Sequence, residues 1–148
     1  MIKTVIPWVF VVAVLCVEFN ERTKSMVPAD EWMSVGEVTV LPTNEGRAPI
    51  LEVARVIKKN FIGEWSVTLR RLEQGGSVVA CEATGAHEYR TDSRLPAEIN
   101  LDWWTAPVKC DLRAGMYRVH TVWTVKAVGY PEKYIIRDSN VFEVRPAR

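Results

Sequence analysis

The amino-acid sequence predicts an all-β domain, a two-layer antiparallel sandwich, that follows an N-terminal hydrophobic helix. One observation is an unbroken apolar run from Val5 to Val17, close to the N-terminus. The other is a series of short segments beyond it in which apolar and polar residues alternate, separated by turn residues, as in antiparallel strands with one buried face. We therefore divide the chain into a signal-anchor or signal peptide (1–19), a tether (20–34) and the sandwich (35–148).

The size and charge of the chain narrow the class of protein. With 148 residues, 48% of them hydrophobic and 25% charged, the chain has the composition of one ordinary folded domain behind a short leader. The formal net charge is +1, and Lys and Arg are scattered among Asp and Glu. Because no basic stripe forms, we expect no nucleic-acid partner.

The apolar run begins after Lys3, which is the order of charge and apolarity found in secretory signals. No pair of small residues precedes a cleavage point between Ala13 and Phe19, which favours an uncleaved membrane anchor through residues 2–19. A cleaved signal peptide is the alternative. Lipid attachment at Cys16 is another, although Leu15 stands where a small residue is required. The last alternative is that the apolar run is a buried strand or helix of the domain itself.

These alternatives bear on where the domain lies. We expect the sandwich outside the cytoplasm, on the periplasmic side if the segment anchors it, or secreted if the segment is cleaved. The residues after the apolar run, 20–34, are polar, mixed and without a period, and they include Pro28. They are predicted to be an irregular tether.

The first half of the domain contains four predicted strands. Residues 35–41 alternate and stop at a Pro-Thr-Asn-Glu-Gly turn, and a second strand runs from Leu51 toward Ile57. In the third, Trp65, Val67 and Leu69 share one face. A Gln-Gly-Gly turn then leads to a fourth strand through Cys81, so residues 64–84 are predicted to form a hairpin.

The second half contains three more. Ile99, Leu101 and Trp103 form an inward set in a predicted strand over 99–103. Residues 117–126 give a long alternation, with Tyr117 and Trp123 among the inward side chains. After a Gly-Tyr-Pro bend, a last strand is expected around 141–144. About seven strands at this spacing favour two packed sheets.

One stretch carries a resemblance to a known fold. Residues 112–119, Leu-Arg-Ala-Gly-Met-Tyr-Arg-Val, resemble the L-x-x-G-x-Y-x-V corner of immunoglobulin-like and fibronectin-like sandwiches. The resemblance implies an immunoglobulin-like sandwich in which Leu112, Gly115 and Tyr117 form a structural corner and the Tyr117 hydroxyl bonds back to the backbone. Val119 stands where antibody domains place a core cysteine, so their usual disulfide is not implied. The resemblance implies no particular function.

Cys81 and Cys110 are an even pair in a domain expected outside the cytoplasm, which predicts a disulfide between them. Two separate buried thiols are the alternative. His87 and His120 are distant in sequence and no C-x-x-C pair occurs, so we expect no metal site.

Sequence motifs of catalysis are missing. No G-x-S-x-G elbow and no glycine-rich phosphate loop occurs. Asp102 beside Trp103 and Trp104 fits an acid in an aromatic cleft, but a carboxylate in a loop is the commoner case. We expect no enzymatic activity and no cofactor.

Aromatic residues are the candidate contacts instead. In a strand, Trp103 and Trp104 point to opposite faces, which makes Trp104 the outward member. An exposed Trp104 near Tyr89 or Tyr130 would grip a protein partner or stack on a sugar, whereas a Trp104 covered by a loop would do neither.

Three functions fit these features. The first is an extracytoplasmic, membrane-anchored binding module with a protein partner in the envelope. The second is a structural or assembly component of a bacterial or phage-encoded envelope complex, and the absence of an N-glycosylation sequon suits that origin. The third is a carbohydrate-binding domain with a glycan ligand.

Overall fold

The computed structural model describes residues 5–104 and 110–147, and most of these residues lie in β-strands. The elements in chain order are α1 (Val5–Met26), the 3-10 helix η1 (Ala29–Glu31), β1 (Met33–Val40), β2 (Thr43–Asn44), β3 (Ile50–Ile57), β4 (Phe61–Glu73), β5 (Gly76–Tyr89), β6 (Glu98–Asn100), α2 (Leu101–Trp104), β7 (Gly115–Lys126), β8 (Lys133–Asp138) and β9 (Phe142–Arg145).

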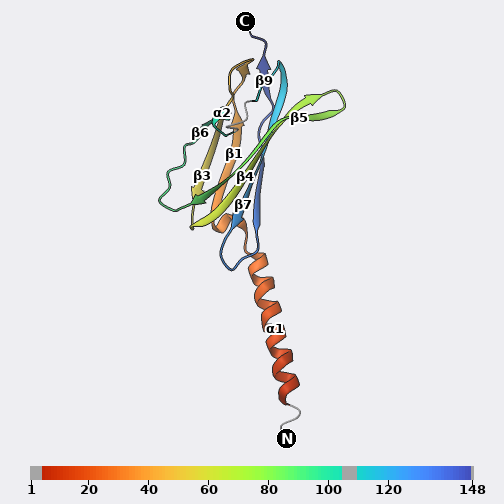
Figure 1. Ribbon diagram of the computed structural model, residues 1–148, viewed down its shortest axis with the longest axis vertical. Helices are drawn as coiled ribbons and strands as arrows, with labels where there is room; N and C mark the ends of the chain where they lie inside the picture. The colour runs from red at the N-terminus through yellow and green to blue at the C-terminus, as the bar shows by residue number, and fades with distance from the viewer. Residues whose placement is uncertain (1–4, 105–109, 148) are drawn as a thin grey trace.

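The N-terminal helix continues through the first part of the predicted tether. Pro7 lies in its first turn, where a proline is tolerated, and the helix ends just before Pro28, which disfavours helical geometry at the residue before it. Figure 1 shows α1 projecting from one end of the strands, with β9 pointing to the opposite end. Although a membrane span was predicted through residues 2–19, no helix among the described residues is long and apolar enough to cross a membrane.

The strands form two sheets. The small sheet has the order β1-β3-β6, and its strand pairs are antiparallel. The large sheet has the order β2-β9-β7-β4-β5, with β8 also paired to β7, and its pairs are antiparallel except for the short parallel pair of β2 and β9. The predicted hairpin of β4 and β5 is present, and Gly75 supplies the positive φ that its turn requires.

The core draws side chains from both sheets. Val38 and Leu51 come from the small sheet and Val67, Val119 and Trp123 from the large one, and all five belong to one buried cluster. Every second residue of β7 from Tyr117 to Val125 is buried, as the alternation predicts. The all-β fold class is thus confirmed at the level of antiparallel sheets around an apolar core.

Two predicted strands differ from the structure. In β1, a bulge between Val35 and Val38 shifts the register, so both of these residues are buried although a strict alternation would separate them. The predicted strand over 99–103 is wrong after Asn100, because the chain turns into α2. The Asn100 Oδ1 atom accepts a hydrogen bond from the backbone N–H of Asp102 at 2.8 Å, which is the contact of a helix N-cap.

Candidate functional site

The predicted Cys81–Cys110 disulfide is present. It joins the middle of β5 to the segment that leads into β7, with the two Cα atoms 5.7 Å apart. Cys81 is buried beside Leu69, its partner across β4 and β5, so the bridge lies against the core. The disulfide therefore fixes the entry to β7 relative to the edge of the large sheet.

The corner residues lie just beyond that bridge. The Tyr117 hydroxyl donates a hydrogen bond to the Arg113 carbonyl at 2.8 Å, so it bonds back to the backbone four residues earlier in the chain. Leu112 is buried, and Gly115 opens β7 where the Arg71 guanidinium passes close to its backbone. Tyr117 and Leu112 thus stabilise the turn into β7.

The three predicted aromatic contacts come from different elements of the fold. Tyr89 is 4% exposed and stacks on Phe61 with ring centroids 4.9 Å apart, so its ring lies in the interior, and its contact with a ligand stays a prediction. Tyr130 is 42% exposed in the turn between β7 and β8, where its ring meets Trp32 edge to face. Trp104 lies in α2 rather than in a strand, and its side chain is outside the described part of the structure.

The burial of Tyr89 has an electrostatic effect. Loss of water raises the pKa of its phenol above the ordinary value, and the charge of the nearby Arg55 guanidinium offsets part of that rise. The same burial lowers the pKa of Arg55. Both groups line a cavity of about 280 Å³ that Trp65 also borders. Tyr89 therefore belongs to the interior at the edge of the two sheets.

A hollow of about 470 Å³ lies on the large sheet. Its polar side chains are Ser66 and Glu64 of β4, Thr84 of β5 and Thr124 of β7. We call it the hydroxyl hollow. Ser66 pairs with Thr84 across β4 and β5, and Glu64 pairs with Thr124 across β4 and β7. All four therefore lie on the face of the large sheet opposite the core, which we call the outer face.

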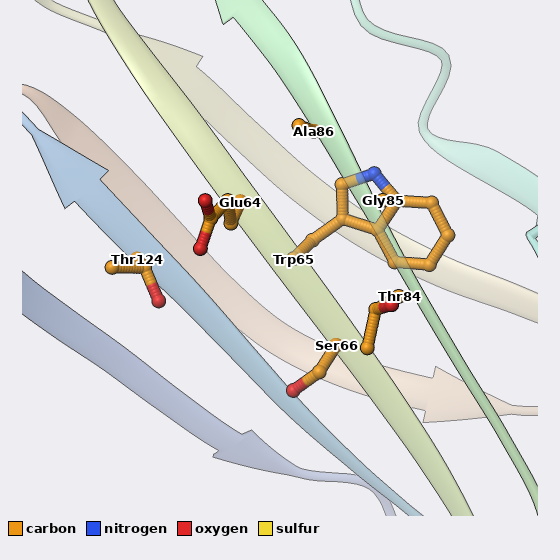
Figure 2. Close-up of a pocket in the computed structure, with 7 residues that line it drawn as sticks. All are labelled: Glu64, Trp65, Ser66, Thr84, Gly85, Ala86 and Thr124. Atoms are coloured by element: carbon orange, nitrogen blue, oxygen red, sulfur yellow. The ribbon is translucent and has the colours of Figure 1, made fainter.

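Trp65 and Gly85 also line this hollow. Trp65 and Gly85 are partners across β4 and β5, and their side-chain positions belong to the other face of the sheet. Figure 2 shows the Trp65 indole extending across β5 at Gly85, with Ser66 and Thr84 close to it. A Cβ atom on Gly85 would lie 2.6 Å from Cε2 of the indole, so glycine is needed there.

Charge surrounds one end of the hydroxyl hollow. The Lys126 ammonium donates a hydrogen bond to the Glu64 carboxylate and also lies 3.5 Å from the carboxylate of Glu132. The bond to Glu64 raises the pKa of Lys126, and the bond that the Tyr134 hydroxyl donates to Glu132 raises the pKa of Tyr134. The Glu64 carboxylate at the hollow is thus already paired with Lys126.

Apolar side chains flank the hollow on the same face. Tyr134 and Ile136 of β8 are 59% and 53% exposed, and their partners on β7 are Thr124 and Val122. Ile62 of β4 is 60% exposed at the end nearest α1. Hydroxyls in a shallow hollow beside exposed aliphatic and aromatic groups can hydrogen-bond and bury apolar area at once, which suits binding.

The two histidines lie apart. His120 on the outer face has its Nδ1 atom 2.7 Å from the Asp138 carboxylate, whereas the His87 ring meets Tyr89 edge to face. Over residues 5–104 and 110–147, no group of three or more His, Cys, Asp or Glu residues is placed to hold a metal ion.

No protein-family model matches the chain, and a search of curated proteins finds no significant match.

Sequence reasoning did not identify the hydroxyl hollow or its apolar border. Ser66 was visible as a polar residue of its strand, but its adjacency to Thr84 and Thr124 depends on strand register. The strand β8 was missed altogether, although Tyr134 and Ile136 alternate with the buried Ile135, and this pattern was the available signal.

Proposed function

We propose that the two sheets form an immunoglobulin-like sandwich and that this sandwich is a non-catalytic binding module. The strand order supports the fold, because β1-β3-β6 and β9-β7-β4 correspond to the A-B-E and G-F-C strands of such domains. The contact between Tyr117 and Arg113 supports it independently, because it is the corner contact of that fold at the start of the F strand.

The observation that carries the binding function is the outer face of the large sheet. Three large apolar side chains, Ile62, Tyr134 and Ile136, are each more than half exposed around the hydroxyl hollow. Their exposure leaves apolar area in water that a protein partner would bury. We propose that this face binds a protein of the cell envelope.

The location is part of the same proposal. A disulfide such as Cys81–Cys110 is typical of proteins outside the cytoplasm, where thiols are oxidised. We propose that residues 2–19 bring the chain to the membrane, either as an anchor or as a signal segment that is removed. A reporter enzyme fused to the C-terminus and active only in the cytoplasm tests this, because activity of the fusion would contradict the proposal.

Capture from the envelope tests the binding function. The tagged full-length chain is compared with Ile136→Asp, which places a charge in the proposed interface, and with Val128→Asp as the control. Val128 is 100% exposed in the turn after β7, outside the outer face. We expect one envelope protein, identified by mass spectrometry and rebound in purified form, to bind the wild type and Val128→Asp but not Ile136→Asp. Equal binding by all three would refute the proposal.

Two other functions are distinguished by further measurements. A stable homo-oligomer by light scattering, lost in Ile136→Asp, would favour a structural component of an envelope assembly. The hydroxyls of Ser66, Thr84 and Thr124 in the hydroxyl hollow favour a glycan as the alternative ligand. A glycan or peptidoglycan pull-down that Ser66→Leu abolishes would support it, and Trp104→Ala tests the role first predicted for that residue.

A further inference from the structure

A second feature of the outer face lies beyond the hydroxyl hollow. Arg70 of β4 and Arg118 of β7 are direct partners across the two strands. Both side chains are exposed, because they alternate with the buried Leu69 and Val119. Partners of this kind begin about 5 Å apart, and like charges placed directly opposite each other destabilise a sheet. We call these two residues the arginine pair.

No described residue pairs with the charge of either arginine. Neither guanidinium forms an ion pair or a side-chain hydrogen bond with any residue that the structure describes. Residues 1–4, 105–109 and 148 contain no Asp or Glu. Asp138 lines the same depression, but its carboxylate is 2.7 Å from Nδ1 of His120. Two guanidinium groups and one carboxylate, that of Asp138, therefore line the depression, which leaves it with a net positive charge.

The pair also borders a depression of about 270 Å³, which Ser77 and Leu72 line as well. Ser77 comes from β5, next to the β4–β5 turn, so with Asp138 of β8 four strands contribute to the depression. The Ser77 hydroxyl can donate a further hydrogen bond, and Leu72 gives the depression an apolar wall. This places donors on more than one side of a small ligand.

We propose that the arginine pair binds a tetrahedral oxyanion, a phosphate or sulfate group, in this depression. Each guanidinium presents a fork of N–H donors that matches two oxygens of such a group. A phosphate monoester carries a charge of about −1.5 to −2, which balances two arginines, whereas one carboxylate balances one. Binding would replace the repulsion between Arg70 and Arg118 with shared attraction to the anion.

The position of the site indicates what carries the anion. Arg70 lies eight residues beyond Ile62, the β4 residue paired with Lys126 near α1, which is about 26 Å at about 3.3 Å per residue. Lys133, at the start of β8, contacts the end of α1. The arginine pair thus lies away from the helix, so we assign the anion to a soluble or polymeric ligand rather than to headgroups of a membrane at α1. The assignment does not depend on the envelope partner proposed above.

Titration of the full-length chain with inorganic phosphate and with sulfate tests the site, followed by amide chemical shifts and compared with chloride at equal ionic strength. We expect saturable shifts at Arg70, Arg118 and Ser77. Binding should weaken by about tenfold or more in Arg70→Ala and in Arg118→Ala, because each loses a charge-assisted pair of hydrogen bonds. Arg94→Ala removes an exposed arginine from the loop before β6 and should bind as the wild type does.

Arg70→Glu separates binding from folding. Its carboxylate would face Arg118 across the strands, so the midpoint of urea unfolding should rise while phosphate binding is lost. Shifts with phosphate and sulfate no larger than those with chloride would overturn the proposal. So would equal binding by the wild type and Arg118→Ala. Arginine-dependent binding to vesicles of anionic phospholipid, without binding of the free anions, would overturn the assignment of the ligand.

Discussion

Removal of the disulfide should destabilise the domain by restoring freedom to the unfolded chain. Cys81 and Cys110 are separated by 29 positions, and the Cys81–Cys110 bridge holds the ends of this loop together in every unfolded conformation. For a loop of that length the chain-entropy relation gives about 12 cal/mol/K, or about 3.6 kcal/mol at room temperature. This is a large part of the 5–15 kcal/mol that is typical of a whole domain. We therefore expect Cys81→Ala/Cys110→Ala to lower the free energy of unfolding by about 3.6 kcal/mol.

Urea unfolding followed by tryptophan fluorescence measures this loss. The reference protein carries Cys16→Ala, which removes the exposed thiol of α1 and prevents cross-linking between chains. The same reference protein, reduced with a thiol reagent, should lose about as much stability as the double variant. A change below about 1 kcal/mol in both experiments would refute the loop-entropy argument, because the prediction is several times larger.

Three further predictions concern single side chains. Tyr117→Phe should cost about 1 to 2 kcal/mol of stability, since the Arg113 carbonyl loses its bond from the hydroxyl; urea unfolding measures it. Gly85→Ala should cost about 1 to 3 kcal/mol, because the new methyl group overlaps the Trp65 indole, and a lower melting temperature reports it. The Glu45 carboxylate accepts hydrogen bonds from the backbone N–H groups of Ala114 and Ala147. These bonds, that of Ala114 most strongly, lower the pKa of Glu45 from the ordinary value near 4.5. Its contribution is present above that ordinary value and is lost as the pH falls through the lowered pKa, so the urea midpoint should fall less steeply with acid in Glu45→Gln.

Tyr117→Phe and Gly85→Ala each have a matched control. Tyr134→Phe removes a hydroxyl whose partner is the exposed Glu132, and it should change stability by less than about 0.5 kcal/mol. Gly76→Ala adds a methyl group where no atom lies within 4 Å, so it should leave the melting temperature nearly unchanged. If Tyr117→Phe or Gly85→Ala behaved like its control, the corresponding contact would not stabilise the domain. If the urea midpoint of Glu45→Gln fell with acid as steeply as that of the wild type, Glu45 would not contribute to the acid dependence of stability.

Long alternation was the most reliable guide to the fold. β7 was predicted because its buried residues from Tyr117 to Val125 repeat at every second position without interruption. The buried face of β1 could not be assigned in this way. Val35 and Val38 are both apolar, and only the pairing with β3 reveals the bulge between them. The short helix α2 has too few residues for a helical period, and its N-cap, Asn100, was the signal that sequence reasoning passed over.

The site was less predictable for a physical reason. Exposure of an aromatic residue depends on its neighbours across the sheet, and Tyr89 is buried because register places it opposite Phe61. The hydroxyl hollow likewise exists because Ser66 and Thr84, small residues on separate strands, become partners. The cysteines were easier, because their even count predicts a bridge without knowledge of register.

Lys133 joins the start of β8 to the end of α1. Its ammonium donates hydrogen bonds to the carbonyls of Lys24 and Ser25, at 3.1 and 2.5 Å, in the last turn of the helix. A positive charge at the C-terminal end of a helix also interacts favourably with the negative pole of the helix dipole. α1 has 22 residues, about 33 Å of helix at about 1.5 Å per residue, and its end is fixed to the start of β8. Lys133 therefore ties the end of α1 to β8, the strand that carries Tyr134 and Ile136 of the outer face.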